Sequence, residues 1–121
     1  MPIDADGLVR EFCAAWERLD PDEIAAYFTP DAIYHNIPMQ PIVGRDAIRQ
    51  LLASFKTAIV SIRFEVLRQV STGGIVMNER VDYINNGSRT IALPVMGVFE
   101  VSEGQIKAWR DYFDLGQYTN G

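Results

Sequence analysis

The apolar residues of this chain follow a helical period up to about Val60 and a period of two after it. Before that point, apolar side chains recur at spacings of three and four residues, as on one face of a helix. The helices predicted from this pattern span residues 8–19, 21–28 and 46–58, with a short strand at residues 32–37. After Val60, apolar and charged residues alternate, as they do in half-buried strands. The first strand predicted there begins at Ile62, and three further strands span residues 75–84, 89–101 and 105–115.

Turn-forming and capping residues separate these segments. Asp20-Pro21 is a helix-start signal, because an aspartate caps free N–H groups and proline suits the first helical turn. Thr29-Pro30 is expected to end that helix. Gly73-Gly74 and Asn85-Asn86-Gly87 indicate hairpin turns. Pro94, inside a predicted strand, is expected to produce a bulge or a bend, because proline cannot donate to a sheet ladder.

The order of these elements predicts the fold class. Helices followed by long antiparallel hairpins are typical of an α+β fold, not of the strand–helix alternation of a parallel sheet. We therefore predict N-terminal helices packed in the concave face of a curved, mixed and mostly antiparallel sheet. Such a sheet forms a cone with an apolar interior suited to a small ligand. A length of 121 residues fits one domain, residues 1–121, because two domains would each have too little core.

Charge and cysteine content disfavour several classes of function. A formal net charge of −5 argues against nucleic-acid binding, which needs a basic surface. No apolar run reaches the roughly 18 residues of a membrane span, so we expect no membrane partner. The N-terminal residues lack a signal-peptide pattern and the single cysteine, Cys13, excludes an internal disulfide, so we expect a cytoplasmic protein. With one histidine and one cysteine, a His/Cys metal site is implausible, and we expect neither a metal nor an organic cofactor.

Polar residues on three predicted strands would face the interior of the cone. Because side chains alternate along a strand, each strand presents one set of residues to one face. These sets are Tyr34 and Asn36; Asn78, Arg80, Asp82 and Ile84; and Trp109, Asp111 and Phe113. The alternation leaves open that the second set is an ordinary solvated strand face. Asp111 is expected to be buried, because its neighbours on the same face are two aromatic rings. A buried carboxylate needs a partner.

Arg80 is a candidate partner for two acids. Its planar guanidinium can bind one carboxylate on each edge, so it would bridge Asp82 and Asp111 if the strands share a sheet. Two acids at this separation tend to share one proton, which leaves a base and an acid in the same pocket near neutral pH. The Tyr34 phenol and the Asn36 amide could hold a water molecule beside them. These groups and an apolar interior together indicate the addition of water to an uncharged organic molecule.

Five short strings resemble the limonene-1,2-epoxide hydrolase family. They are Tyr34-His35-Asn36, Gly44-Arg45-Asp46, Glu79-Arg80-Val81-Asp82, Gly97-Val98-Phe99 and Trp109-Arg110-Asp111-Tyr112-Phe113-Asp114-Leu115. The strings follow the family's order over nearly the whole chain, and typical members carry a further N-terminal segment. The resemblance implies a nuclear transport factor 2-like (cystatin-like) cone, a homodimer, and cofactor-free hydrolysis of an apolar, cyclic epoxide to a vicinal diol.

The resemblance also implies a role for each polar residue. Asp111 would be the general base that deprotonates the attacking water, and Tyr34 and Asn36 would hold that water. Asp82 would be the general acid that protonates the epoxide oxygen, and Arg80 would hold both acids in register. The residues that would line the substrate cavity, each of which also suits a plain core, are Phe55, Ile59, Phe64, Ile84, Leu93, Val95, Trp109 and Phe113.

Other interpretations of the same pattern stay open. A ketosteroid isomerase or a polyketide cyclase also places a carboxylate beside an apolar cavity, but it shuttles a proton on carbon and needs no held water. A bridging arginine favours the hydrolase, because an isomerase usually uses an oxyanion hole. A non-catalytic binding or dimerisation module would lack converging ionisable groups. The other route to epoxide hydrolysis, through an Asp nucleophile and a His base, is set aside, since His35 is the only histidine and no nucleophile-elbow motif occurs.

Overall fold

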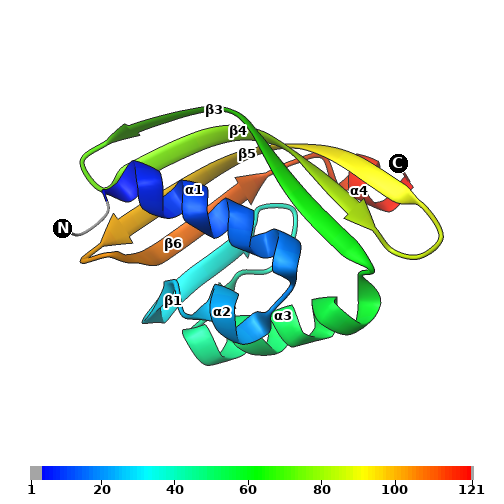
Figure 1. Ribbon diagram of the computed structural model, residues 1–121, viewed down its shortest axis with the longest axis horizontal. Coiled ribbons are helices and arrows are strands. Elements are labelled where there is room, and N and C mark those ends of the chain that lie inside the picture. Colours follow the sequence, from blue (N-terminus) through cyan, green and yellow to red (C-terminus); the bar gives the residue numbers. More distant parts are fainter. Residues whose placement is uncertain (1–3, 121) are drawn as a thin grey trace.

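The computed structural model describes residues 4–120, which form a six-stranded sheet with helices on its concave face (Figure 1). The helices are α1 (Ala5–Ala15), the 3-10 helix η1 (Trp16–Arg18), α2 (Pro21–Ala25), α3 (Arg45–Ala58) and α4 (Leu115–Asn120). The strands are β1 (Phe28–Asn36), β2 (Ile42–Val43), β3 (Ser61–Thr72), β4 (Ile75–Asn85), β5 (Thr90–Ser102) and β6 (Gln105–Tyr112). The predicted α+β fold with a curved sheet is confirmed.

The sheet has the order β2-β1-β6-β5-β4-β3. Within the described chain, β1 and β6 are parallel and the other neighbouring strands are antiparallel, so the sheet is mixed as predicted. The parallel register places Tyr34 beside Trp109 and Asn36 beside Asp111. Two polar residues that are far from Asp111 in the sequence therefore lie on the neighbouring strand.

An aromatic cluster joins α1 to the sheet. Phe12, on the apolar face of α1, is fully buried. Its ring packs edge to face against Phe28, Phe99 and Trp109, at centroid distances of 5.4, 6.0 and 5.0 Å. Such a pair contributes roughly 0.5–1.5 kcal/mol beyond the area it buries. These contacts fix the helix over β1, β5 and β6.

Two boundaries near the second helix differ from the sequence-based prediction. The first helical segment ends at Arg18 because Leu19 adopts a left-handed conformation, with φ of 48°. The second helix ends at Ala25, not near residue 28, since Phe28 already pairs with Ile106 of β6. The strand therefore begins at Phe28 and contains the Thr29-Pro30 pair that was expected to end a helix. Pairing across the sheet overrides the local helix signal here.

The C-terminal end of the chain also differs from the prediction. The last strand ends at Tyr112 instead of Leu115, and the short helix α4 follows it. The side chain of Asp114 accepts a hydrogen bond from Gly116 N at 3.0 Å, and its carbonyl accepts one from Tyr118 N at 3.3 Å. Asp114 therefore caps a helix and does not extend the strand. None of the helices in residues 4–120 is long and apolar enough to cross a membrane.

Of the bulge or bend expected at Pro94, the bulge is contradicted by the strand pairing. β5 pairs with β4 in an unbroken register through Pro94, which lies opposite Val81. β6 pairs with β5 from Met96 to Ser102, so Pro94 lies beyond the end of that ladder. A strand with one neighbour tolerates a proline whose nitrogen faces the side without a neighbour, because no ladder bond is then lost.

Candidate active site

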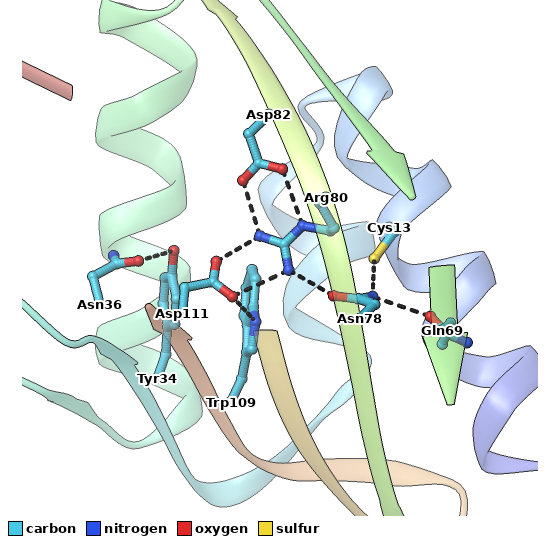
Figure 2. A network of polar contacts seen from close by, with 9 residues as sticks. All are labelled: Cys13, Tyr34, Asn36, Gln69, Asn78, Arg80, Asp82, Trp109 and Asp111. Carbon is cyan, nitrogen blue, oxygen red and sulfur yellow. Dashed lines mark hydrogen bonds and ion pairs between the residues drawn. The ribbon is translucent and has the colours of Figure 1, made fainter. Parts of the chain in front are cut away.

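Three adjacent strands bring the predicted arginine and acids together on the concave face (Figure 2). Asn78 of β4, Gly97 of β5 and Asp111 of β6 lie opposite one another in register. Gly97 has no side chain, so the guanidinium of Arg80 occupies the space over it and reaches Asp111. Asp82 follows two residues later on β4 and points to the same face.

Arg80 binds each aspartate through two hydrogen bonds. Nε and Nη2 donate to Asp82 Oδ1 and Oδ2, at 3.0 and 2.9 Å. Nη1 and Nη2 donate to Asp111 Oδ1 and Oδ2, at 3.1 and 2.7 Å. Nη1 also donates to Asn78 Oδ1 at 3.2 Å. These bonds use all five N–H donors of a guanidinium. The bridge that the sequence pattern predicts between the two acids is thus present.

The bridged residues are almost completely removed from solvent. The exposed fraction is 0% for Arg80, 5% for Asp82 and 3% for Asp111, so a solvated strand face is excluded. Burial opposes the charge on Arg80, but Asp111 and Asp82 outweigh it and raise the pKa of the guanidinium further. Burial raises the pKa of Asp82 to about 6, against the attraction of Arg80 and with help from the charge of Asp111. Asp82 therefore keeps its proton at a pH where a solvated aspartate has lost it.

An aromatic stack orients the carboxylate of Asp111. The Trp109 ring lies between the rings of Tyr34 and Phe99, with centroid distances of 4.3 and 5.3 Å and interplanar angles of 9° and 16°. The stack directs Trp109 Nε1 toward Asp111 Oδ1, to which it donates at 2.7 Å. Together with the two bonds from Arg80, this contact fixes the carboxylate on both of its edges.

Tyr34 and Asn36 border the same cavity as Asp82 and Asp111. Tyr34 Oη donates to Asn36 Oδ1 at 3.3 Å. Burial raises the pKa of Tyr34 well above its ordinary value, and the charge of Asp111 adds to the shift, so the phenol keeps its proton. A hydroxyl, an amide and a carboxylate therefore border the same cavity, and groups of these kinds can bind a water molecule.

The cavity has a volume of about 320 Å³ and its remaining walls are mainly apolar. Its size and composition suit a small, uncharged molecule. The side chains from the predicted lining set that border it are Phe55, Ile59, Phe64, Ile84, Leu93, Val95 and Phe113. Trp109 does not border the cavity, because its ring is completely buried in the stack between Tyr34 and Phe99.

Several lining residues were not predicted. They are Trp16, Met39, Gln40, Ile42, Leu51, Ile62 and Tyr118. Tyr118 comes from α4, which is too short for hydrophobic periodicity to reveal. Met39 and Gln40 lie in the loop between β1 and β2, whose position depends on strand pairing. Trp16 and Leu51 lie on apolar helix faces, a signal of burial that does not distinguish a core from a cavity.

Comparisons with known proteins place the chain in a family. Residues 4–120 match the family model described as the limonene-1,2-epoxide hydrolase catalytic domain. The chain is 33% identical over 113 residues to epoxide hydrolase EphG of Mycobacterium tuberculosis (strain ATCC 25618 / H37Rv). This alignment covers 93% of the chain and 75% of EphG.

Solved structures agree with this assignment. An LEH-like epoxide hydrolase from M. tuberculosis superposes with a TM-score of 0.85 at 31% identity, covering 93% of this chain and 84% of that chain. An NTF2-like protein from Burkholderia pseudomallei K96243 has the same TM-score of 0.85 at 18% identity, covering 96% of this chain and 95% of its own. The second likeness concerns the fold alone. The nuclear transport factor 2-like fold implied by the sequence resemblance is confirmed.

Proposed function

The chain belongs to the limonene-1,2-epoxide hydrolase family, and on this premise we propose that it hydrolyses an apolar, cyclic epoxide to a vicinal diol in one step. The observation that carries the proposal is the pair of buried aspartates bound by one arginine at the wall of an apolar cavity. An acid and a base in one pocket suit a reaction in which one proton leaves water while another reaches an oxygen.

In the proposed mechanism, Tyr34, Asn36 and Asp111 hold the attacking water. Asp111 removes a proton from this water as its oxygen forms a bond to one epoxide carbon. The bond between that carbon and the epoxide oxygen breaks, and Asp82 donates its proton to the oxygen. Each such proton transfer is typically worth about 10²–10⁴-fold in rate. Transfer of a proton from Asp111 to Asp82, directly or through solvent, restores the starting state.

The remaining groups position these reactants. Arg80 holds the two acids together and balances part of their charge. The apolar walls of the cavity would bind the hydrocarbon part of the substrate, with Phe55, Phe64 and Leu93 among the contacts. We assign Trp109 to the orientation of Asp111 and not to substrate contact, because the indole does not border the cavity.

A panel of cyclic epoxides, assayed by chiral analysis of the diols in isotopically labelled water, tests the proposed function. Diol formation with the label in the product after a single turnover is the expected result. Label in the protein would indicate an ester intermediate and contradict the one-step mechanism. Isomerisation or cyclisation of a carbonyl substrate without diol formation would favour a proton-transfer enzyme. Binding of the compounds without conversion would favour a non-catalytic module.

The pH dependence of the reaction follows from the role given to Asp82. The acid has to be protonated, and burial raises its pKa to about 6. We therefore expect kcat/KM to fall tenfold per pH unit above about pH 6. Initial rates across a pH series measure this decrease in kcat/KM. Asp82→Asn should abolish the pH-dependent decrease together with most of the activity. A kcat/KM that stays constant from pH 6 to well above 7 would contradict the assignment of Asp82 as the acid.

Gly97 is expected to be essential to this site because its missing side chain makes room for the arginine. A Cβ atom at position 97 would lie 2.5 Å from Arg80 Nη1 and 2.9 Å from Asp111 Oδ1. Gly97→Ala should therefore cost about 1–3 kcal/mol of stability by overpacking and lower kcat/KM about 100-fold by displacing the guanidinium. Thermal unfolding and diol formation measure the two effects. Ala92→Val, on the exposed side of the same strand, should change neither, and an active Gly97→Ala protein would refute the role of the missing Cβ.

We also propose that the protein acts as a cytoplasmic homodimer. The family resemblance is the basis for the dimer, and the single cysteine, Cys13, which excludes an internal disulfide, is the basis for the cytoplasmic location. Support comes from exposed apolar side chains on the face of the sheet opposite the helices, where Met96 lies opposite Tyr112 and both are 45% exposed. Met77, on the neighbouring strand, is 42% exposed. A stable and active monomer in analytical ultracentrifugation would contradict the proposal.

A further inference from the structure

A chain of polar contacts leads from Arg80 away from the cavity toward α1 (Figure 2). Arg80 Nη1 donates to Asn78 Oδ1 at 3.2 Å, and Asn78 Nδ2 donates to Gln69 Oε1 at 3.0 Å. Gln69 Nε2 in turn donates to the carbonyl oxygen and to Oδ1 of Asp6, at 3.0 and 2.8 Å. Asp6 lies in the first turn of α1. The proposed mechanism uses neither Asn78 nor Gln69.

The contacts with Asp6 determine the orientation of both amides. Asp6 offers Gln69 two acceptors, so the amide nitrogen of Gln69 faces α1 and its oxygen faces Asn78. A flipped Asn78 would place its NH2 group against Arg80 Nη1 and its oxygen against Gln69 Oε1, which sets donor on donor and acceptor on acceptor. Asn78 Nδ2 also lies 3.7 Å from the weakly accepting Sγ of Cys13. The hydrogen bonds that link Asp6, Gln69 and Asn78 therefore keep Asn78 Oδ1 directed at the guanidinium.

The burial of Asn78 argues against a role in packing alone. Its side chain is 1% exposed, and an amide in such a place costs free energy unless its polar atoms are bonded. An apolar residue would fill the same space without that cost. Arg80 Nη1 divides its two N–H groups between Asn78 and Asp111. Without Asn78, one buried N–H group would lose its acceptor and the guanidinium could turn in its plane, which would move both carboxylates.

We propose that Asn78 is a positioning residue for Arg80. Through Nη1 it fixes the guanidinium plane, and thereby the orientation of Asp111 relative to Asp82, while Gln69 keeps Asn78 in the required orientation. The inference rests on the proposed hydrolase function, but it assigns a role to residues outside that mechanism. The role is to hold the acid and the base at the geometry in which both proton transfers occur together.

Substitution of the two amides tests this inference. Asn78→Leu should lower kcat about 10- to 100-fold and leave KM nearly unchanged, because the substrate walls stay intact. Gln69→Leu should also lower kcat, but by a smaller factor. The double variant should be no slower than Asn78→Leu alone, since Gln69 acts through Asn78. Gln105→Leu is the matched control: it removes a half-buried amide that donates to the carbonyl of Phe28 at 3.2 Å, and its kcat should stay at the wild-type value.

A second measurement follows the guanidinium itself. Nitrogen NMR of Arg80 in the wild-type protein should show slow rotation about the Cζ–Nη1 bond, and faster rotation in folded Asn78→Leu. Unchanged rotation, unchanged kcat in a folded Asn78→Leu protein, or losses that add in the double variant would each overturn the inference. A wild-type protein that converts no epoxide would refute the proposed function instead, and the NMR comparison would then decide the positioning role.

Discussion

Replacing Asp111 with Asn is expected to lower kcat for epoxide hydrolysis about 10³-fold, because the amide cannot take the proton from the attacking water. The side chain keeps its shape, so the protein should still fold, but with lower stability, because the new NH2 group would face Arg80 Nη2, a donor that bonds Asp111 Oδ2 at 2.7 Å. The oxygen of the amide can still accept hydrogen bonds from Trp109 Nε1 and Arg80 Nη1. In the wild-type protein these donors lie 2.7 and 3.1 Å from Asp111 Oδ1. Single-turnover measurement of diol formation, with circular dichroism as the check on folding, measures the effect.

Asp31→Asn is the matched control for this substitution. Asp31 is an exposed aspartate on β1, whose carboxylate accepts a hydrogen bond from Thr29 Oγ1 at 3.0 Å. The same chemical change there should leave the rate at the wild-type value. A folded Asp111→Asn protein with a nearly normal rate would remove Asp111 from the role of base, and with it the proposed path of the proton.

Removal of Arg80 is expected to have the largest effect on stability. Arg80→Met leaves Asp82 and Asp111 buried without their cation, which should cost about 3–5 kcal/mol near neutral pH and abolish turnover. Methionine keeps an apolar side chain against Phe64, whose ring centroid lies 4.6 Å from Arg80 Cζ. Protonation of Asp82, whose pKa burial raises to about 6, removes one of the uncompensated charges. The loss of stability should therefore shrink as the pH falls from about 8 to about 5.

Denaturant unfolding across this pH range measures the effect of Arg80→Met. Arg68→Met is the matched control, because Arg68 pairs with Glu79 on the exposed side of β4 and 77% of its side chain is accessible. Screening by solvent makes such a pair weak, so the control should unfold almost like the wild type. Equal stability losses in the two variants would show that the two buried salt bridges of Arg80 stabilise the fold no more than the exposed pair of Arg68 and Glu79 does.

Much of the site was predictable because its signals are local. Alternation along one strand places Arg80 and Asp82 on the same face, and alternation along the last strand places Asp111 between two aromatic residues. A guanidinium has two edges, so the residue types alone suggest that it bridges two acids within its reach. Family resemblance added the roles, which the sequence pattern by itself left open between a hydrolase and a proton-transfer enzyme.

Other parts of the molecule depend on contacts that no local pattern encodes. β1 begins at Phe28 because this residue pairs with Ile106, although Thr29-Pro30 resembles a helix end. α4 and its cavity-lining residue Tyr118 follow a strand that was expected to continue. Trp109 has the same alternation as Asp111, yet its ring lies in an aromatic stack and not at the cavity.

Helical and strand periods are properties of neighbouring residues, so the α+β order of the chain and the face on which each polar side chain lies follow from local patterns. Which of these faces meet depends on contacts between distant segments. The parallel pairing of β1 with β6 brings Asn36 beside Asp111, and the empty space over Gly97 lets Arg80 cross β5 to reach that carboxylate. Both depend on strand register and on steric room between residues far apart in the chain, which are fixed only when the whole sheet has formed.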